Sequence, residues 1–206
     1  MAESCCDKSD LEPLLKSAKW ALWFALLVNF TMFVVELGAS FTANSESLKA
    51  DALDFLADSI SYVVTLFVLH RSEQARDRSA AFKGWLMTAM AVWVGGSAIY
   101  KMWSGQLPEA PVMGAVGLAA LVSNMSVAFV LFRFRGRDMN MQSVWLCSRN
   151  DALANLAVIL AAGGVWATTT RWPDLIVAAI ISGLNATAGV QVLRALKTDQ
   201  VRGAKR

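Results

Sequence analysis

Three aspartates are the residues in this chain best suited to chemistry. Asp51, Asp54 and Asp58 stand at positions i, i+3 and i+7 of an otherwise apolar segment. On a helix of about 3.6 residues per turn this spacing puts their side chains along a single stripe. An aspartate near the centre of a bilayer costs about 2.5–3.5 kcal/mol on insertion scales, so three on one membrane helix need partners, protons or a metal ion.

A second set of candidate ligands lies in residues 145–156. Cys147 and Asp151 are separated by one helical turn, and Asn155 continues the same face by another turn. Together with Asp54 and Asp58 they form two i, i+4 ligand pairs on two helices. Four ligands that converge in this way predict a tetrahedral site suited to zinc or cadmium, and a thiolate shifts the preference away from Mn²⁺ and Mg²⁺. For Cys147 taken alone, the alternative is a small apolar side chain in a helix interface.

The elements that would position these residues are membrane helices. The chain has 206 residues, of which 56% are hydrophobic and 17% charged, and this composition is typical of an all-α integral membrane protein. The apolar runs predict a bundle of six transmembrane helices, each close to the length of about 20 residues needed to cross a bilayer. We expect spans at residues 18–40, 46–70, 81–103, 113–132 and 139–167, and a sixth that ends near residue 196. Residues 1–17 and 197–206 are then short tails, and 18–196 form the membrane domain.

The basic residues predict the orientation of this bundle. Only Lys49, Lys101 and Arg171 lie at or near the connections that follow spans one, three and five. The other basic residues lie in the tails, in the remaining loops or at the helix ends beside them. The positive-inside rule therefore places both termini in the cytoplasm. Short clusters of this kind, with a net charge of +3, do not make a nucleic-acid-binding surface.

Further polar residues lie inside the predicted spans. Asn29 and Glu36 are seven residues apart on one face of the first span, which must look into the bundle. Asn29, Glu36 and Asn155 either surround the metal ligands or form hydrogen bonds between helices. Asp51 has three interpretations, as a carboxylate beside the site, a residue on the ion path or a partner of Lys49.

Other features indicate no chemistry. The chain has three cysteines, which do not form a disulfide framework, and Cys5 and Cys6 lie in the N-terminal tail. The single histidine, His70, is expected at the membrane surface beside arginines, and no nucleophile–base pair supports an enzyme. The run Gly95–Ser97 predicts a close helix contact.

The motifs together resemble those of the cation diffusion facilitators, which export divalent transition metals in exchange for protons. The resemblance covers essentially the whole membrane region. Its carriers are Asn29, Glu36 and Gly38 in the first span, the run 47–58 in the second and the run 151–156 in the fifth. In that family a His or Asp, followed four residues later by an Asp, forms the transport site in each of the second and fifth spans. The resemblance thus implies that Asp54, Asp58 and Asp151 are ligands, and Cys147 stands where the family usually has His or Asp.

This resemblance implies a function and a set of partners. We expect proton-coupled efflux of Zn²⁺ or Cd²⁺ from the cytoplasm, with protons, the lipid bilayer and a second copy of the chain as partners and without a prosthetic group. The location would be the cell (inner) membrane if the protein is bacterial. The chain resembles a short form without the C-terminal cytoplasmic domain common in the family. The alternatives are the same transport with Co²⁺, Fe²⁺, Ni²⁺ or Mn²⁺, or a membrane metal sensor or assembly subunit that moves no ion.

Overall fold

The computed structural model describes the backbone of residues 8–68, 73–133 and 139–203, with most side chains of residues 19–133 and 151–194. These ranges form a bundle of six α-helices and no described strand. A short π-helical turn, Val64–Val68, extends the second helix. The helices are α1 (Lys8–Thr42), α2 (Glu46–Val63), α3 (Glu73–Ser104), α4 (Ala110–Phe132), α5 (Met139–Thr168) and α6 (Trp172–Gly203).

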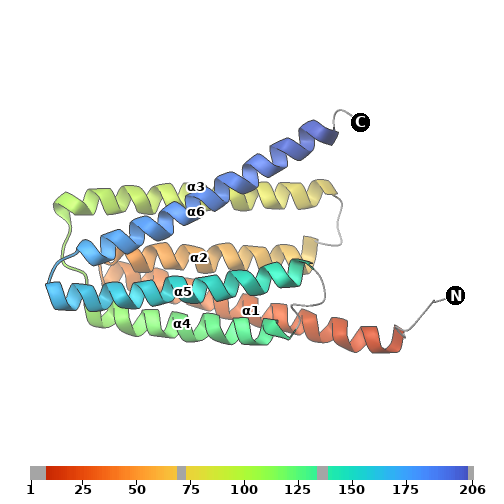
Figure 1. The fold of residues 1–206 in the computed structure, drawn as a ribbon, viewed down its shortest axis with the longest axis horizontal. Coiled ribbons are helices and arrows are strands. Elements are labelled where there is room, and N and C mark those ends of the chain that lie inside the picture. Colours follow the sequence, from red (N-terminus) through yellow and green to blue (C-terminus); the bar gives the residue numbers. More distant parts are fainter. Residues whose placement is uncertain (1–7, 69–72, 134–138, 204–206) are drawn as a thin grey trace.

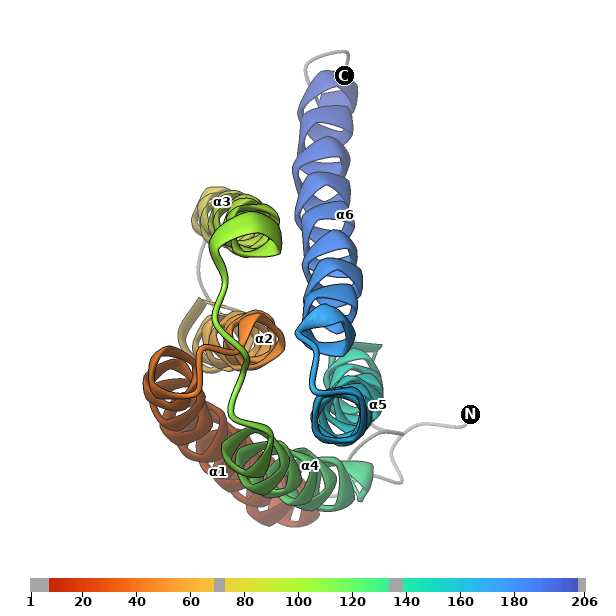
Figure 2. The ribbon, with the colours of Figure 1, turned by 90° about the vertical axis from the view of Figure 1, so that its left-hand side faces the viewer.

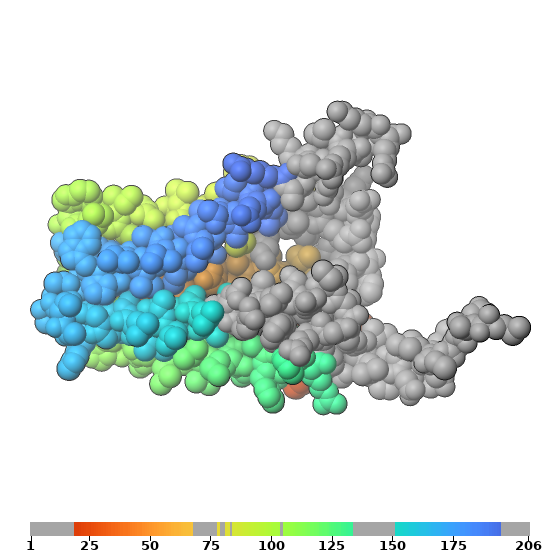
Figure 3. Space-filling model, viewed as in Figure 1, coloured from red at the N-terminus to blue at the C-terminus, as the bar shows by residue number. Residues whose placement is uncertain are grey.

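The helices run alongside one another and change direction at the two ends of the bundle (Figure 1). Residues 43–45, 105–109 and 169–171 connect helices at one end, which we call the connection end. Helix α1 begins and α6 ends at the other, the terminal end. Viewed from the connection end, α1, α2, α4 and α5 form one group, while α3 and α6 lie to one side of it (Figure 2). The most extensive contacts join α4 to α5, α3 to α6 and α1 to α2. In the space-filling view, α2 is visible between α5 and α6 (Figure 3).

The predicted all-helical membrane bundle is confirmed. In the described part of the chain, four segments are long and apolar enough to cross a bilayer: 19–42, 110–132, 151–168 and 172–194. Helix α2 is not among them, because buried charged residues, such as Glu46, Lys49 and Asp51, interrupt its apolar sequence. It is nevertheless enclosed by other helices rather than by lipid, because it packs on α1, α3, α5 and α6. A helix with several charged residues therefore lies inside the bundle.

Several helices are longer than the spans predicted from the sequence. Helix α1 already begins at Lys8, within the segment expected to be a tail, and α6 continues to Gly203. Helix α3 begins at Glu73, where a loop was expected. An apolar run marks only the part of a helix in contact with lipid, while the hydrogen bonds of the backbone continue into water. Cys5, Cys6 and His70 lie outside the described residues.

The close helix contact predicted for Gly95–Ser97 involves Ser97, whose Oγ donates to Glu46 Oε2 of α2 at 2.6 Å, but not the two glycines. A Cβ at Gly95 or Gly96 would meet nothing within 4 Å. Helices α3 and α6 instead touch at a different glycine, because a Cβ on Gly189 would lie 2.5 Å from Thr88 Oγ1. A small residue thus does bring these two helices together, but it is Gly189 on α6 and not a glycine of the run on α3.

Helix α2 is fastened to α6 at the connection end by the buried carboxylate of Asp174. Its Oδ1 accepts hydrogen bonds from Ser45 Oγ (2.7 Å), Ser47 N (3.0 Å) and Ser47 Oγ (2.6 Å). Its Oδ2 accepts one from Glu46 N (2.8 Å). The first backbone N–H groups of a helix have no partner within the helix. Asp174 supplies that partner from another helix and so closes the α2–α6 contact.

Helix α3 is tied to the same end of α2 by a buried ion pair network around Glu46. Its Oε1 accepts from Lys49 Nζ at 2.7 Å and from Lys101 Nζ at 2.9 Å. Its Oε2 accepts from Ser97 Oγ at 2.6 Å. Lys101 also donates to the carbonyl oxygen of Asn44 at 2.7 Å. Both lysines expected near this end of the bundle therefore join helices rather than facing water.

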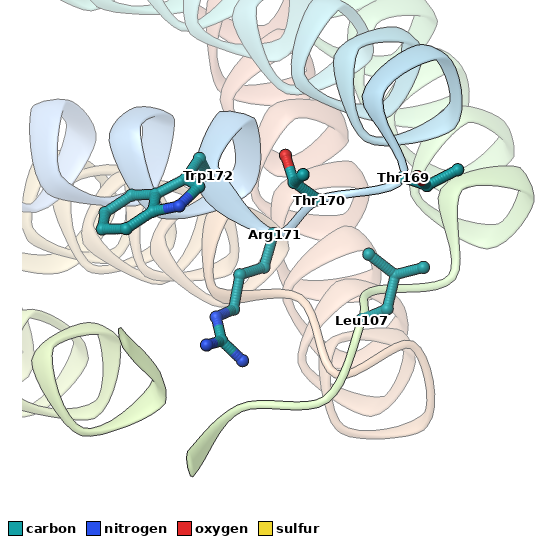
Figure 4. A pocket seen from close by; sticks show the side chains of 5 residues that line it. All are labelled: Leu107, Thr169, Thr170, Arg171 and Trp172. Carbon is teal, nitrogen blue, oxygen red and sulfur yellow. The ribbon is translucent and has the colours of Figure 1, made fainter. Parts of the chain in front are cut away.

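Arg171 makes the third tie, from the turn between α5 and α6. Its side chain extends from this turn toward the α3–α4 connection, beside Leu107 (Figure 4). Its guanidinium donates to the carbonyl oxygens of Met102, at 3.0 Å, and Gly105. All three basic residues near the connection end are thus occupied in internal contacts. Their position does not weaken the charge asymmetry that predicts a cytoplasmic terminal end.

Candidate functional site

The structure brings together Asp58 of α2 and Asp151 of α5. The side chain of Asp58 is only 9% exposed and accepts a hydrogen bond from Tyr62 Oη at 3.2 Å. The carboxyl groups of Asp58 and Asp151 lie within hydrogen-bonding reach of each other. Because two carboxylates hold only acceptors, such a contact requires a proton or a cation between them. Asp151 Oδ2 is buried and accepts no hydrogen bond from the described residues.

The other two predicted ligands are Asp54 on α2 and Cys147 on α5. Asp54 is half-buried on the same stripe of α2, and its charge acts on Asp151. Cys147 lies one turn before Asp151 in α5, but its side chain is outside the described part of the structure. Among the side chains that are described, no group of three or more His, Cys, Asp or Glu residues is arranged to hold a metal ion. The four-residue ligand set therefore stays a prediction.

Asp51 belongs to a buried chain of hydrogen bonds that crosses three helices. Asn155 Nδ2 of α5 donates to Asp51 Oδ2 at 2.7 Å. Asn124 Nδ2 of α4 then donates to Asn155 Oδ1 at 2.9 Å. The sequence left open a pairing between Asp51 and Lys49, and this is wrong because Lys49 pairs with Glu46. Lys49 precedes Asp51 by only two residues, so their side chains leave α2 on different faces and do not meet.

The polar residues of α1 face the interior as predicted. Asn29 is 1% exposed, and Glu36 is completely buried. Asn29 donates to the carbonyl oxygen of Ala25 at 2.8 Å, so its amide group is bound within its own helix. Glu36 lies within hydrogen-bonding reach of Asp51. Of the two, Glu36 is therefore the one that joins the carboxylates of α2.

Sequence reasoning missed two residues around these carboxylates. Tyr62 was not considered, although it follows Asp58 by four residues and so had to lie on the same face of α2. Asn124 lies in the fourth predicted span, 113–132, and its amide side chain alone does not connect it with Asp51. Nothing in one sequence pairs Asn124 with Asn155, because that contact depends on how α4 packs against α5.

A comparison with known protein families found a match. The model of the cation efflux transmembrane domain matches residues 22–197. The chain belongs to the cation diffusion facilitator family. A search of curated proteins found no match.

Membership in the family confirms several predictions. This facilitator is an integral, multi-pass membrane protein with a six-helix bundle. Its family consists of transporters that carry metal cations out across the membrane. The match extends over α2 and α5, which bear the predicted ligands, and over Glu36 and Asn124 beside them.

Proposed function

We propose that this facilitator exports Zn²⁺ or Cd²⁺ from the cytoplasm in exchange for protons, with Asp54, Asp58, Cys147 and Asp151 as metal ligands. The observation that carries the proposal is the contact between the carboxyl groups of Asp58 and Asp151 from two different helices. A buried and a half-buried acid this close favour a divalent cation, or protons in its place.

Competition between metal and protons would couple their movements. Metal ligands must be deprotonated, so an ion that binds at Asp58 and Asp151 expels the protons that they share. Protons arriving from the opposite side of the membrane then release the ion. The same groups therefore hold either cargo, but not both at once, and this exclusion is what an antiport cycle requires.

The hydrogen bonds and ion pairs at the connection end support the proposal that this structure is open to the cytoplasmic side. Asp174 and Glu46 hold α2 against α6 and α3 at that end. Asp54, farther along α2, is half-buried rather than enclosed. An ion would then reach the ligands from the terminal end, on the cytoplasmic side. Release to the other side requires the contacts of Asp174 and Glu46 to separate, as rigid groups of helices rock against one another.

Transport by purified protein in proteoliposomes tests the proposal. A proton gradient should drive uptake of Zn²⁺ and Cd²⁺, with Asp58→Ala as the matched control. We expect the unmutated protein to move at least one of these ions and Asp58→Ala to move neither. Zinc that binds without moving would instead support a sensor or assembly subunit.

The thiol of Cys147 would set the choice of metal. A thiolate prefers Zn²⁺ and Cd²⁺, whereas carboxylate and imidazole ligands also accept Mn²⁺ and Co²⁺. Cys147→Asp and Cys147→His should therefore lose preference for Cd²⁺ over Mn²⁺ without loss of all transport. If the unmutated protein prefers Co²⁺, Fe²⁺, Ni²⁺ or Mn²⁺, the proposal of zinc and cadmium as substrates is wrong, but the proposed ligand residues are not contradicted.

We propose that residues 18–196 form the transporting unit, flanked by residues 1–17 and 197–206, and that two copies associate in the membrane. The family resemblance is the support for the homodimer. Cross-linking in native membranes, compared with the mass of the purified protein in detergent, tests this association.

A further inference from the structure

Seven buried side-chain oxygen atoms in the described part of the bundle have no hydrogen-bond partner, and apart from Asp151 Oδ2 and Ser182 Oγ these atoms lie on α1, α2 and α4. The five on these helices are both carboxyl oxygens of Glu36, Oδ1 of Asp51, and the side-chain carbonyl oxygens of Asn29 and Asn124. Buried polar atoms almost always have a partner, and one that lacks it often marks an ion or a water molecule. Three of the five belong to Glu36 and Asp51, whose carboxyl groups lie within hydrogen-bonding reach of each other.

The hydrogen-bond chain through Asn155 explains why Asn124 is left with an oxygen, and not a nitrogen, without a partner. Asp51 can only accept, so Asn155 must turn its Nδ2 toward Asp51 and its carbonyl oxygen toward Asn124. Asn124 then has to donate with its own Nδ2, and its carbonyl oxygen is left over. The chain thus uses donors to satisfy Asp51 Oδ2 and leaves oxygens without a donor at both of its ends.

A divalent cation satisfies this arrangement better than one proton. Neither Glu36 nor Asp51 has any exposed surface. One shared proton would link two of their three free oxygens and leave one negative charge buried, which is costly in a membrane interior. A divalent cation neutralises both carboxylates and can contact all three oxygens. Mn²⁺ and Mg²⁺ prefer oxygen ligands and retain water molecules for the remaining positions.

We propose that Glu36 and Asp51 form a second cation site, made only of oxygen ligands, between α1 and α2. Asp51 precedes Asp54 by three residues, about 4.5 Å along the helix axis toward the connection end. Ser47, which binds Asp174, lies one turn beyond Asp51 in the same direction. The second site therefore lies between the ligand set of the proposed function and the closed connection end. Binding of a cation at this second site does not depend on the proposed function. Only its role as a binding site on the exit path of the exported ion rests on that function.

Binding of Mn²⁺ to the purified full-length protein in detergent tests the site, with the electron paramagnetic resonance signal of free Mn²⁺ as the measure. The double variant Asp58→Asn/Asp151→Asn removes the proposed transport ligands, and Glu36→Gln removes one ligand of the second site without changing its size. We expect Mn²⁺ binding to persist in the double variant and to weaken at least tenfold in it when Glu36→Gln is added. Cd²⁺ binding to Glu36→Gln alone should stay within threefold of the unmutated protein, which also shows that this variant folds.

Two results would overturn the second site. One is Mn²⁺ binding that Glu36→Gln leaves unchanged in the double-variant background, and the other is Mn²⁺ binding that disappears with Asp58 and Asp151. Asp51→Asn serves as the alternative to Glu36→Gln if the latter does not yield monodisperse protein. Failure of the proposed function looks different, because Cd²⁺ would then not be transported by the unmutated protein while Mn²⁺ still bound at Glu36.

Discussion

Replacing Asp174 with alanine should destabilise the bundle more than any change on its surface. Asp174 accepts hydrogen bonds from two backbone N–H groups and two serine hydroxyls at the start of α2. The hydroxyl oxygens of Ser45 and Ser47 are 3.2 Å apart and can bond to each other, so we count only the two N–H groups. A buried donor left without an acceptor costs about 1–3 kcal/mol. Two such donors predict a loss of about 2–6 kcal/mol.

Thermal unfolding in detergent measures this loss. For a chain of this size, 1 kcal/mol corresponds to a shift of about 2–4 °C in Tm, so Asp174→Ala should lower Tm by at least about 4 °C. Asp174→Asn keeps one acceptor oxygen and should lie between this variant and the unmutated protein. Thr187→Ala is the control, because Thr187 is exposed and donates only to Leu184 of its own helix. A Tm for Asp174→Ala equal to that of Thr187→Ala would refute the fastening of α2 to α6.

Three further predictions concern packing, the polar chain and pH. Gly189→Ala places a Cβ 2.5 Å from Thr88 Oγ1 and should cost about 1–3 kcal/mol in unfolding free energy. Gly183→Ala, where nothing lies within 4 Å, should change Tm little, and equal effects of the two alanines would contradict the α3–α6 contact. Asn155→Ala removes the donor to Asp51 and should weaken Mn²⁺ affinity at the second site about 10–100-fold, as measured by titration. An unchanged affinity would show that the hydrogen-bond chain does not support that site. Cd²⁺ affinity should rise with pH, because protons compete for the carboxylate and thiol ligands; a Kd independent of pH between 5 and 8 would contradict this competition.

The sequence was sufficient for the class of fold because lipid imposes a strong constraint on it. Long apolar runs have to be helices in a bilayer, so most of the helices and their order followed directly. The inward orientation of Glu36 and Asn29 followed for the same reason, since charged and amide side chains avoid lipid. The spacing of Asp54 and Asp58 on α2 and of Cys147 before Asp151 on α5 also needed only the period of a helix.

Contacts between helices could not be predicted in this way. The role of Asp174 was not predicted, because its four donors lie more than a hundred residues earlier in the chain. Lys49 was considered as a partner of Asp51, whereas the packing of α3 beside α2 assembles Glu46, Lys49 and Lys101 into one network. One sequence specifies which face of a helix is polar, but the partner of that face depends on how the helices pack.

Simultaneous recording of Cd²⁺ and proton movement in proteoliposomes is the most direct test of the central claim. With an acidic lumen, the unmutated protein should carry Cd²⁺ inward while the lumen becomes more alkaline. Asp151→Asn removes a carboxylate that both cargoes are proposed to share, so it should abolish both movements together. Cd²⁺ uptake without any change in lumenal pH, or uptake that persists in Asp151→Asn, would contradict the account.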